Sequence, residues 1–196
     1  MLLQIYWDVD PTIFRWGVLA PRWYGLLFAT GFLIGFYLMR HVFQREDKPE
    51  QDLDFLLFYL LGGTIIGARL GHILFYAPSY YLSNPTEIIA IWEGGLASHG
   101  GLIGVVTAIW IYCRRRDDQP FLWLLDRLAA PVALTGSLIR LGNFFNAEIL
   151  GVPTDLPWGV VFERATRLRE SIPDVPLHPV QLYESICYFL IFVLLW

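Results

Sequence analysis

The chain has few charged residues for its length. Only 16% of its 196 residues are Asp, Glu, Lys or Arg, whereas about a quarter of the residues in soluble domains are charged. Its apolar residues, 56% of the total, lie in clumps rather than at amphipathic spacing. This combination excludes an ordinary soluble domain and indicates a membrane protein. The net charge of −4 gives no reason to expect a nucleic-acid partner.

Cysteines are also scarce, and the two that occur, Cys113 and Cys187, predict no disulfide because the topology below places them on opposite sides of the bilayer. The sequence has no Asp or Glu cluster suited to a metal ion and no Gly-x-Ser-x-Gly motif. We therefore expect no metal and no cofactor. The amino-terminal stretch lacks the basic region and unbroken apolar core of a signal peptide, so the first hydrophobic span is expected to be retained.

Five apolar segments predict an all-α, polytopic helical membrane protein with short interfacial elements. They cover roughly residues 23–40, 55–76, 96–113, 121–146 (the start is 121 or 128) and 182–196. A bilayer core about 30 Å thick needs about 20 helical residues, so we expect four complete transmembrane helices. From Ser185 to Trp196 the fifth segment supplies only about 18 Å of helix. We expect a truncated fifth helix and a chain that is the N-terminal portion of a longer protein.

The distribution of basic residues predicts the orientation. Lys and Arg concentrate in the connectors after the first and third segments, whereas the connector 77–95 has none. By the positive-inside rule the N-terminus then lies outside, and residues 147–181 form an external loop. We interpret the run Arg114–Arg116 as a topology signal alone. Because no internal repeat is visible, residues 1–196 are expected to form a single membrane-embedded domain.

Polar side chains occur inside the apolar segments, where they are costly and often functional. The second segment contains Arg69, and His99 lies about one turn inside the third. The fourth has Arg140, Asn143 and Asn146, whose spacing by threes forms a polar stripe on one side of a helix. All of them fall in the outer half of the membrane, so we expect them to converge on one site.

Each of these residues also has a structural interpretation that the sequence leaves open. Arg69 can extend to the headgroups, His99 can begin a helix where backbones pack closely, and the Arg140 stripe can join helices. As a site, arginines offer planar donors suited to phosphate, asparagines donate to ester or hydroxyl oxygens, and histidine accepts a proton near neutral pH. Such a set fits a phospholipid headgroup at the outer leaflet.

The stretch "IRLGNFFNAEILG", residues 139–151, resembles the signature of bacterial prolipoprotein diacylglyceryl transferases, Gly-Arg-x-Gly-Asn-Phe-x-Asn-Gly-Glu-x-x-Gly. "WYGLLFATGF", "GARLGHILFY", "WEGGLASHGGLIG" and "HPVQLYES" are similar to the family's other motifs, in the same order. Ile139 and Ala147 stand where the signature usually has glycine. The resemblance implies a seven-pass enzyme of the bacterial inner membrane that moves a diacylglyceryl group from phosphatidylglycerol to the lipobox cysteine of a prolipoprotein. This reaction is the first step of lipoprotein maturation and releases glycerol 1-phosphate.

The resemblance and the residue pattern together predict the site. His99 and Arg140 are expected to be catalytic, with His99 taking the thiol proton and Arg140 stabilising the leaving phosphate. Glu148 is expected to orient Arg140 or a loop backbone. The residues expected to bind phosphatidylglycerol are Arg140, Asn143, Asn146, Tyr24, Arg69, Glu148 and Gly151, and further candidates are Gly100, Gly142, Gln181, Tyr183 and Glu184.

The family's last two passes, and an essential arginine associated with them, have no counterpart in these residues. Two alternatives therefore stay open. The chain is a non-catalytic membrane protein that binds or transports phospholipid, or it is an inactive fragment of the transferase.

Overall fold

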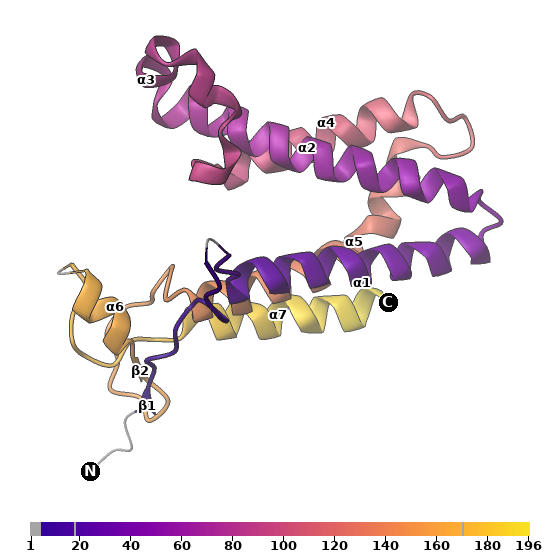
Figure 1. Cartoon of the computed structure of the whole chain (residues 1–196). Helices are drawn as coiled ribbons and strands as arrows, with labels where there is room; N and C mark the ends of the chain where they lie inside the picture. Colours follow the sequence, from indigo (N-terminus) through magenta and orange to yellow (C-terminus); the bar gives the residue numbers. More distant parts are fainter. Residues whose placement is uncertain (1–4, 18, 170) are drawn as a thin grey trace. The chain divides into compact units, whose positions relative to one another are not determined.

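The computed structural model describes residues 5–17, 19–169 and 171–196, which are mainly helical (Figure 1). Within these ranges three helices are long and apolar enough to cross a membrane: α1 (Trp23–Arg45), α2 (Glu50–Tyr76) and α5 (Phe121–Phe145). The predicted helical membrane protein is confirmed at this level. Two further apolar helices, α4 (Ser98–Cys113) and α7 (Val180–Leu195), have 16 residues each. The expected count of four complete spans is therefore not confirmed.

Short elements connect the long helices. The connector 77–95 folds into α3 (Pro78–Ser83) and the 3-10 helices η1 (Pro85–Ile89) and η2 (Ile91–Glu93). The predicted external loop contains α6 (Glu163–Leu168) and strand β2 (Val160–Val161). Strand β2 pairs in parallel with β1 (Ile5–Tyr6), which ties the loop to the beginning of the chain.

Internal contacts divide the described chain into two compact units. The terminal unit consists of the described residues up to Leu38 together with Leu128–Trp196, and the central unit is Met39–Arg127. Helices α1 and α5 each contribute to both. The single domain expected from the sequence stays a prediction.

In the terminal unit, α5 packs against α1 and α7 through small residues. Gly31 of α1 lies so close to Thr135 that an added Cβ would be 2.8 Å from its methyl group. Across α5 and α7, which run side by side in Figure 1, the hydroxyls of Ser137 and Ser185 lie 3.0 Å apart, and Ser185 also donates to the Ser137 carbonyl. These short contacts fix α7 against the second half of α5.

A small apolar core joins the 147–181 loop to the end of α5. Phe144, Phe162 and Leu177 are buried there, and Trp7 packs on Phe144 with ring centroids 4.4 Å apart. Because these residues come from four separate segments, burying them holds the loop over the helix end that contains the polar stripe.

In the central unit, α2 and α4 cross through glycines. A Cβ added at Gly67 would lie 2.4 Å from the carbonyl oxygen of Gly100 and 2.7 Å from the Cα of Gly104. A Cβ at Gly71 would lie 2.6 Å from the Cα of Gly100. Only residues without a side chain allow two backbones this close, and the gain is dispersion contact along the whole crossing.

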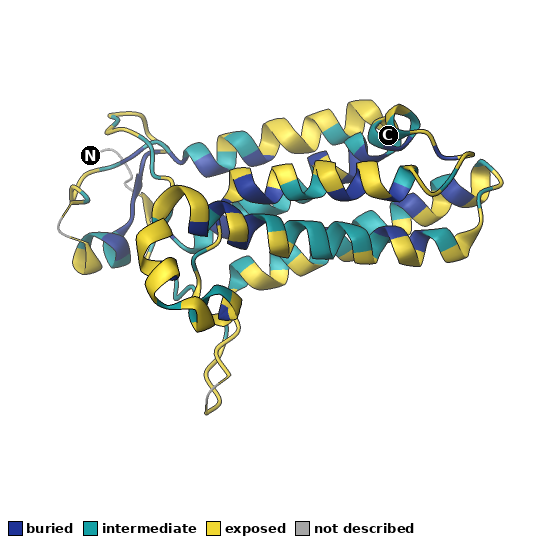
Figure 2. Ribbon diagram, turned by 90° about the horizontal axis from the view of Figure 1, so that it is seen from above, coloured by how far each residue is buried: buried dark blue, intermediate teal, exposed yellow. Residues whose placement is uncertain are grey.

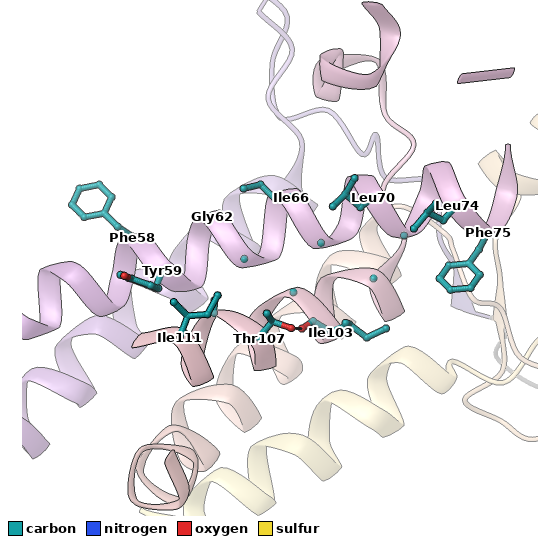
Figure 3. A pocket seen from close by; sticks show the side chains of 16 residues that line it. Phe58, Tyr59, Gly62, Ile66, Leu70, Leu74, Phe75, Ile103, Thr107 and Ile111 are labelled. Atoms are coloured by element: carbon teal, nitrogen blue, oxygen red, sulfur yellow. Dashed lines mark hydrogen bonds between the residues drawn. The ribbon is translucent and has the colours of Figure 1, made fainter. Parts of the chain in front are cut away.

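Beside this crossing the two helices form an apolar groove of about 740 Å³ (Figure 3). Leu70, Leu74 and Phe75 of α2 and Ile103 of α4 are among its lining residues. Exposed residues also run along the helices of the chain (Figure 2). Large exposed apolar side chains of this kind are expected where the surroundings are hydrocarbon rather than water.

The arginine run after α4 is more than a topology signal, which corrects the interpretation from sequence. Arg116 pairs with Asp52 at 2.9 Å and stacks over the Tyr112 ring at 4.0 Å. Gln119, which is fully buried, accepts from the Tyr112 hydroxyl at 2.6 Å and donates to Asp52 at 2.8 Å. Buried polar groups need such partners, so this network anchors the end of α4 to the beginning of α2.

The glycine crossing predicts opposite outcomes for two glycines of the same helix. Gly67→Ala should lower the free energy of unfolding by about 1–3 kcal/mol, because the new Cβ has no room. Gly62→Ala is the control, since a Cβ there meets nothing within 4 Å and alanine favours the helix by roughly 0.5–1 kcal/mol. Thermal unfolding midpoints in detergent measure both. Equal midpoints for the two variants would contradict the close crossing.

Candidate functional site

Helix α5 ends in a left-handed cap that brings polar residues of the 139–151 stretch close together. The amide of Glu148 donates to the carbonyl of Asn143 at 3.0 Å, and the amide of Ala147 donates to that of Phe144 at 3.1 Å. This pair of bonds is the common way for a helix to end when the next residue is left-handed. The chain reverses, and the Glu148 carboxylate accepts from the Asn143 amide at 3.3 Å.

The left-handed residue of this cap is Ala147, with φ +49°. Only glycine adopts this region without steric cost, because a Cβ there approaches the following carbonyl oxygen. The signature that the sequence resembles has glycine at this position, and the cap gives the physical reason. The alanine in this chain is therefore strained.

Arg140 lies one turn before Asn143 on α5 and is neutralised from α7. Its Nε donates to Oε2 of Glu184 at 2.5 Å, and its Nη1 donates weakly to Oδ1 of Asn143 at 3.4 Å. The Arg140 side chain is 26% exposed. Among the described residues its Nη2 makes no further hydrogen bond, so part of the donor fork is free for an anion.

The carboxylate that contacts Arg140 is thus Glu184, whereas the sequence suggested that Glu148 orients either Arg140 or a loop backbone. Glu148 accepts instead from Asn143 and, at 3.4 Å, from Nδ2 of Asn146. Its carbonyl accepts from Nε2 of Gln181 at 2.6 Å. Gln181, Glu184 and Ser185 all face α5 because an i, i+3, i+4 spacing puts them on one side of α7. That spacing was a signal available in "HPVQLYES".

Four of the predicted residues shape the backbone or lie beside the motif. A Cβ at Gly151 would lie 2.4 Å from the His178 carbonyl oxygen, and one at Gly142 would lie 3.0 Å from the Cα of Tyr24. Gly151 therefore lets the loop approach the start of α7, and Gly142 lets α1 approach α5 at Tyr24. Tyr183 accepts from Nε1 of Trp158 at 2.7 Å and its hydroxyl lies 3.1 Å from Nδ1 of His178.

Two buried acceptors near Glu148 have no donor among the described residues. They are Oδ1 of Asn146 and Oε1 of Gln181. Each amide is oriented by the bond that its nitrogen makes to Glu148. A buried acceptor without a partner costs about 1–3 kcal/mol, so this pair is a candidate binding feature. Both residues were expected at the site from sequence, but their unpaired oxygens could not be predicted from it.

The remaining predicted residues belong to the central unit. Arg69 is 5% exposed and its guanidinium donates to main-chain carbonyls of the 87–95 connector. His99 is exposed near the beginning of α4, with the rings of Phe75 and Tyr76 5.1 and 5.8 Å away. Gly100 is part of the α2–α4 crossing. The convergence of these residues with Arg140 stays a prediction.

The comparisons with known proteins agree on one family. The family model for prolipoprotein diacylglyceryl transferase matches residues 11–196. A phosphatidylglycerol–prolipoprotein diacylglyceryl transferase of Chloroherpeton thalassium is 54% identical over 188 residues, which are 96% of this chain and 68% of the relative. The enzyme of that name from Tolumonas auensis is 56% identical over 192 residues, 98% of this chain and 72% of the relative. The enzyme of that name from Porphyromonas gingivalis is 48% identical over 193 residues, which are 97% of this chain and 68% of the relative.

The strained cap gives a prediction of stability. Ala147→Gly should raise the free energy of unfolding by up to about 1 kcal/mol, because the left-handed penalty of about 1–2 kcal/mol exceeds the entropy cost of glycine. Ala29→Gly, an exposed helical position of α1, should lower it by about 0.5–1 kcal/mol. Thermal unfolding in detergent compares them. A loss of stability in both variants would show that Ala147 is not strained.

Proposed function

The chain belongs to the prolipoprotein diacylglyceryl transferase family, and on that premise we propose that it transfers the diacylglyceryl group of phosphatidylglycerol to the lipobox cysteine thiol of a prolipoprotein. The observation that carries the proposal is the half-buried Arg140, oriented by Glu184 and Asn143 with part of its donor fork free. An arginine in an apolar helix is costly unless it has a partner or a ligand. This one has a carboxylate partner at its Nε and, among the described residues, no partner at its Nη2.

In this proposal, Arg140 binds the lipid phosphate through its guanidinium. Asn143, Asn146 and Glu148 form the polar wall beside it, since they are joined to one another by hydrogen bonds at the cap of α5. Gln181 and Glu184 hold that wall and the arginine from α7. The rest of the site is formed by close packing and hydrogen bonding of Tyr24, Tyr183, Gly142 and Gly151.

The glycerol headgroup suits the two buried acceptors. Oδ1 of Asn146 and Oε1 of Gln181 lack donors among the described residues. Phosphatidylglycerol has two hydroxyl groups on its headgroup, and hydroxyls are donors that satisfy such acceptors. A lipid whose headgroup has no hydroxyl would leave them unpaired, which favours the glycerol headgroup over others.

The chemistry displaces a phosphate ester by sulfur. The thiol loses its proton, an S–C bond forms at the glyceryl C3 carbon, and the C–O bond to phosphate breaks to release glycerol 1-phosphate. Because a free thiol has a pKa near 8.5, a nearby base increases the fraction of thiolate. His99 is that base, directly or through water. Arg140 stabilises the charge that builds up on the leaving phosphate.

The membrane placement follows the positive-inside distribution. Helix α4 crosses the membrane with α1, α2 and α5, and α7 begins a fifth crossing. The N-terminus lies outside the bacterial inner membrane, and the Arg140 site opens to the outer leaflet. The basic run after α4 and the lack of Lys and Arg in 77–95 support this orientation.

The proposal is tested by the mass of a lipobox peptide. The purified chain, incubated with phosphatidylglycerol and a lipobox-cysteine peptide, should add one diacylglyceryl mass to the thiol. Arg140→Lys should slow the addition about a hundredfold or more, because a point charge cannot replace the planar fork. Arg22→Lys, at an exposed arginine before α1, is the control. Lipid binding without any added mass would favour a non-catalytic phospholipid-binding protein.

The role of His99 separates chemistry from binding. His99→Gln should abolish transfer and leave the affinity for phosphatidylglycerol unchanged, because a base acts on the thiol and not on the phosphate. His41→Gln, an exposed histidine of α1, should retain wild-type turnover. Lipid affinity is measured by titration of the detergent-solubilised chain, and transfer by the peptide mass. Full turnover in His99→Gln would remove the histidine from the mechanism.

A further inference from the structure

Arg69 is enclosed by main-chain carbonyls of the connector that leads into α4. Its Nε donates to the carbonyl of Ile88 at 3.0 Å, and its Nη2 to that of Glu87 at 2.5 Å. Its Nη1 donates to the carbonyls of Gly94 and Gly95 at 2.6 and 3.1 Å. The guanidinium also lies 4.9 Å from the ring of Tyr81. Carbonyl dipoles and an aromatic face therefore compensate the charge within the central unit.

These bonds leave little capacity for a phosphate. A guanidinium has five N–H groups, and four hydrogen bonds to carbonyls are already made. A bidentate phosphate contact needs two parallel N–H groups. Since Arg69 is only 5% exposed, a phosphate would have to displace carbonyls from these part-buried hydrogen bonds and leave them without this donor.

The four carbonyls lie on both sides of η2, so the connector wraps around Arg69. Gly94 and Gly95 have φ +92° and +71°, and a Cβ at Gly95 would lie 2.7 Å from Nη1 of Arg69 and 2.8 Å from the His72 ring. Two residues later, the amide of Ala97 donates to the carbonyl of Ala68 at 2.9 Å. The connector is thus fastened to α2 up to the residue that precedes α4.

We propose that Arg69 is a positioning residue for the transfer reaction: it holds residues 87–97 against α2 and thereby fixes the first turn of α4, where His99 lies. The inference rests on the proposed transferase function and replaces the phosphate contact that the sequence suggested. Helix α4 begins at Ser98, so any change in the path of the connector moves the His99 side chain directly. Displacing a catalytic group by about 1 Å is enough to cost about a hundredfold in rate.

The kinetic test uses Arg69→Lys in the full chain with phosphatidylglycerol vesicles and the lipobox peptide. Lysine keeps the charge, but all of its N–H donors are on a single nitrogen, so it cannot bind four carbonyls that lie on both sides of η2. We expect kcat to fall about tenfold to a hundredfold, with KM for phosphatidylglycerol changed by less than about twofold. Arg45→Lys, at an exposed arginine ending α1, is the matched control and should retain both values.

A second variant and a structural readout make the test independent of one substitution. Gly95→Ala keeps the arginine at position 69, but the new Cβ crowds its Nη1 and strains the backbone. This variant should therefore lose kcat as Arg69→Lys does. Amide hydrogen exchange should accelerate in residues 87–97 in both variants, while the 143–151 segment exchanges as in wild type. If Arg69→Lys is unfolded, exchange will instead be faster throughout the chain, and the kinetics and exchange of Gly95→Ala then decide.

Two results would overturn the proposal. A raised KM with unchanged kcat and unchanged exchange in 87–97 would assign Arg69 to the phosphate. Wild-type kinetics and exchange in both variants would remove it from any positioning role. If the wild-type chain transfers no diacylglyceryl group, the proposed function fails. Amide exchange of residues 87–97 in Arg69→Lys then still decides whether Arg69 holds this connector against α2, an arrangement that we call the Arg69 clamp.

Discussion

The ion pair between Arg140 and Glu184 is the interaction on which the candidate site depends. A guanidinium on an apolar helix must find opposite charge or polar partners, because water is scarce around it. Glu184 supplies the charge from α7 at 2.5 Å, and Asn143 supplies a weaker contact from the same helix. The serine contact between Ser137 and Ser185 holds the two helices at the separation that this pair requires.

In the central unit, the charge of a buried arginine is compensated by different groups. Arg69 is more deeply buried than Arg140, and its donors are directed to the carbonyls of one connector rather than to a carboxylate. A clamp of this kind fixes a backbone path, whereas an ion pair with a free edge leaves donors for a ligand. The two arginines that the sequence grouped together as anion holders therefore have different local environments. Their different partners argue for different roles.

The helices were predictable from the sequence because long apolar segments indicate membrane-spanning helices directly. The segments expected at 55–76, 96–113 and 121–146 correspond to α2, α4 and α5 within a few residues. The same segments contain the glycines at which α2 and α4 pack closely. Strand β1 was not predictable, because two residues pair with Val160–Val161 far along the chain. The clamp around Arg69 was equally hidden, since its acceptors are main-chain carbonyls that any sequence possesses.

For part of the candidate site, the sequence predicted which residues lie close together but not which residues they contact. The motif spacing grouped Arg140, Asn143 and Glu148 at the end of α5, and the left-handed cap joins them there. The partner of Arg140 was missed because Glu148 is nearer in sequence, while Glu184 reaches the guanidinium only through the packing of α7.

A double-mutant cycle on phosphatidylglycerol affinity tests the central claim most directly. If Glu184 acts by orienting Arg140, then Glu184→Gln weakens lipid binding in the wild-type background and has no further effect in an Arg140→Gln background. The coupling free energy should then fall in the range of about 0.5–3 kcal/mol that is found for residues in contact. The same loss of affinity from Glu184→Gln in both backgrounds would contradict the account, because the carboxylate would then act independently of the guanidinium.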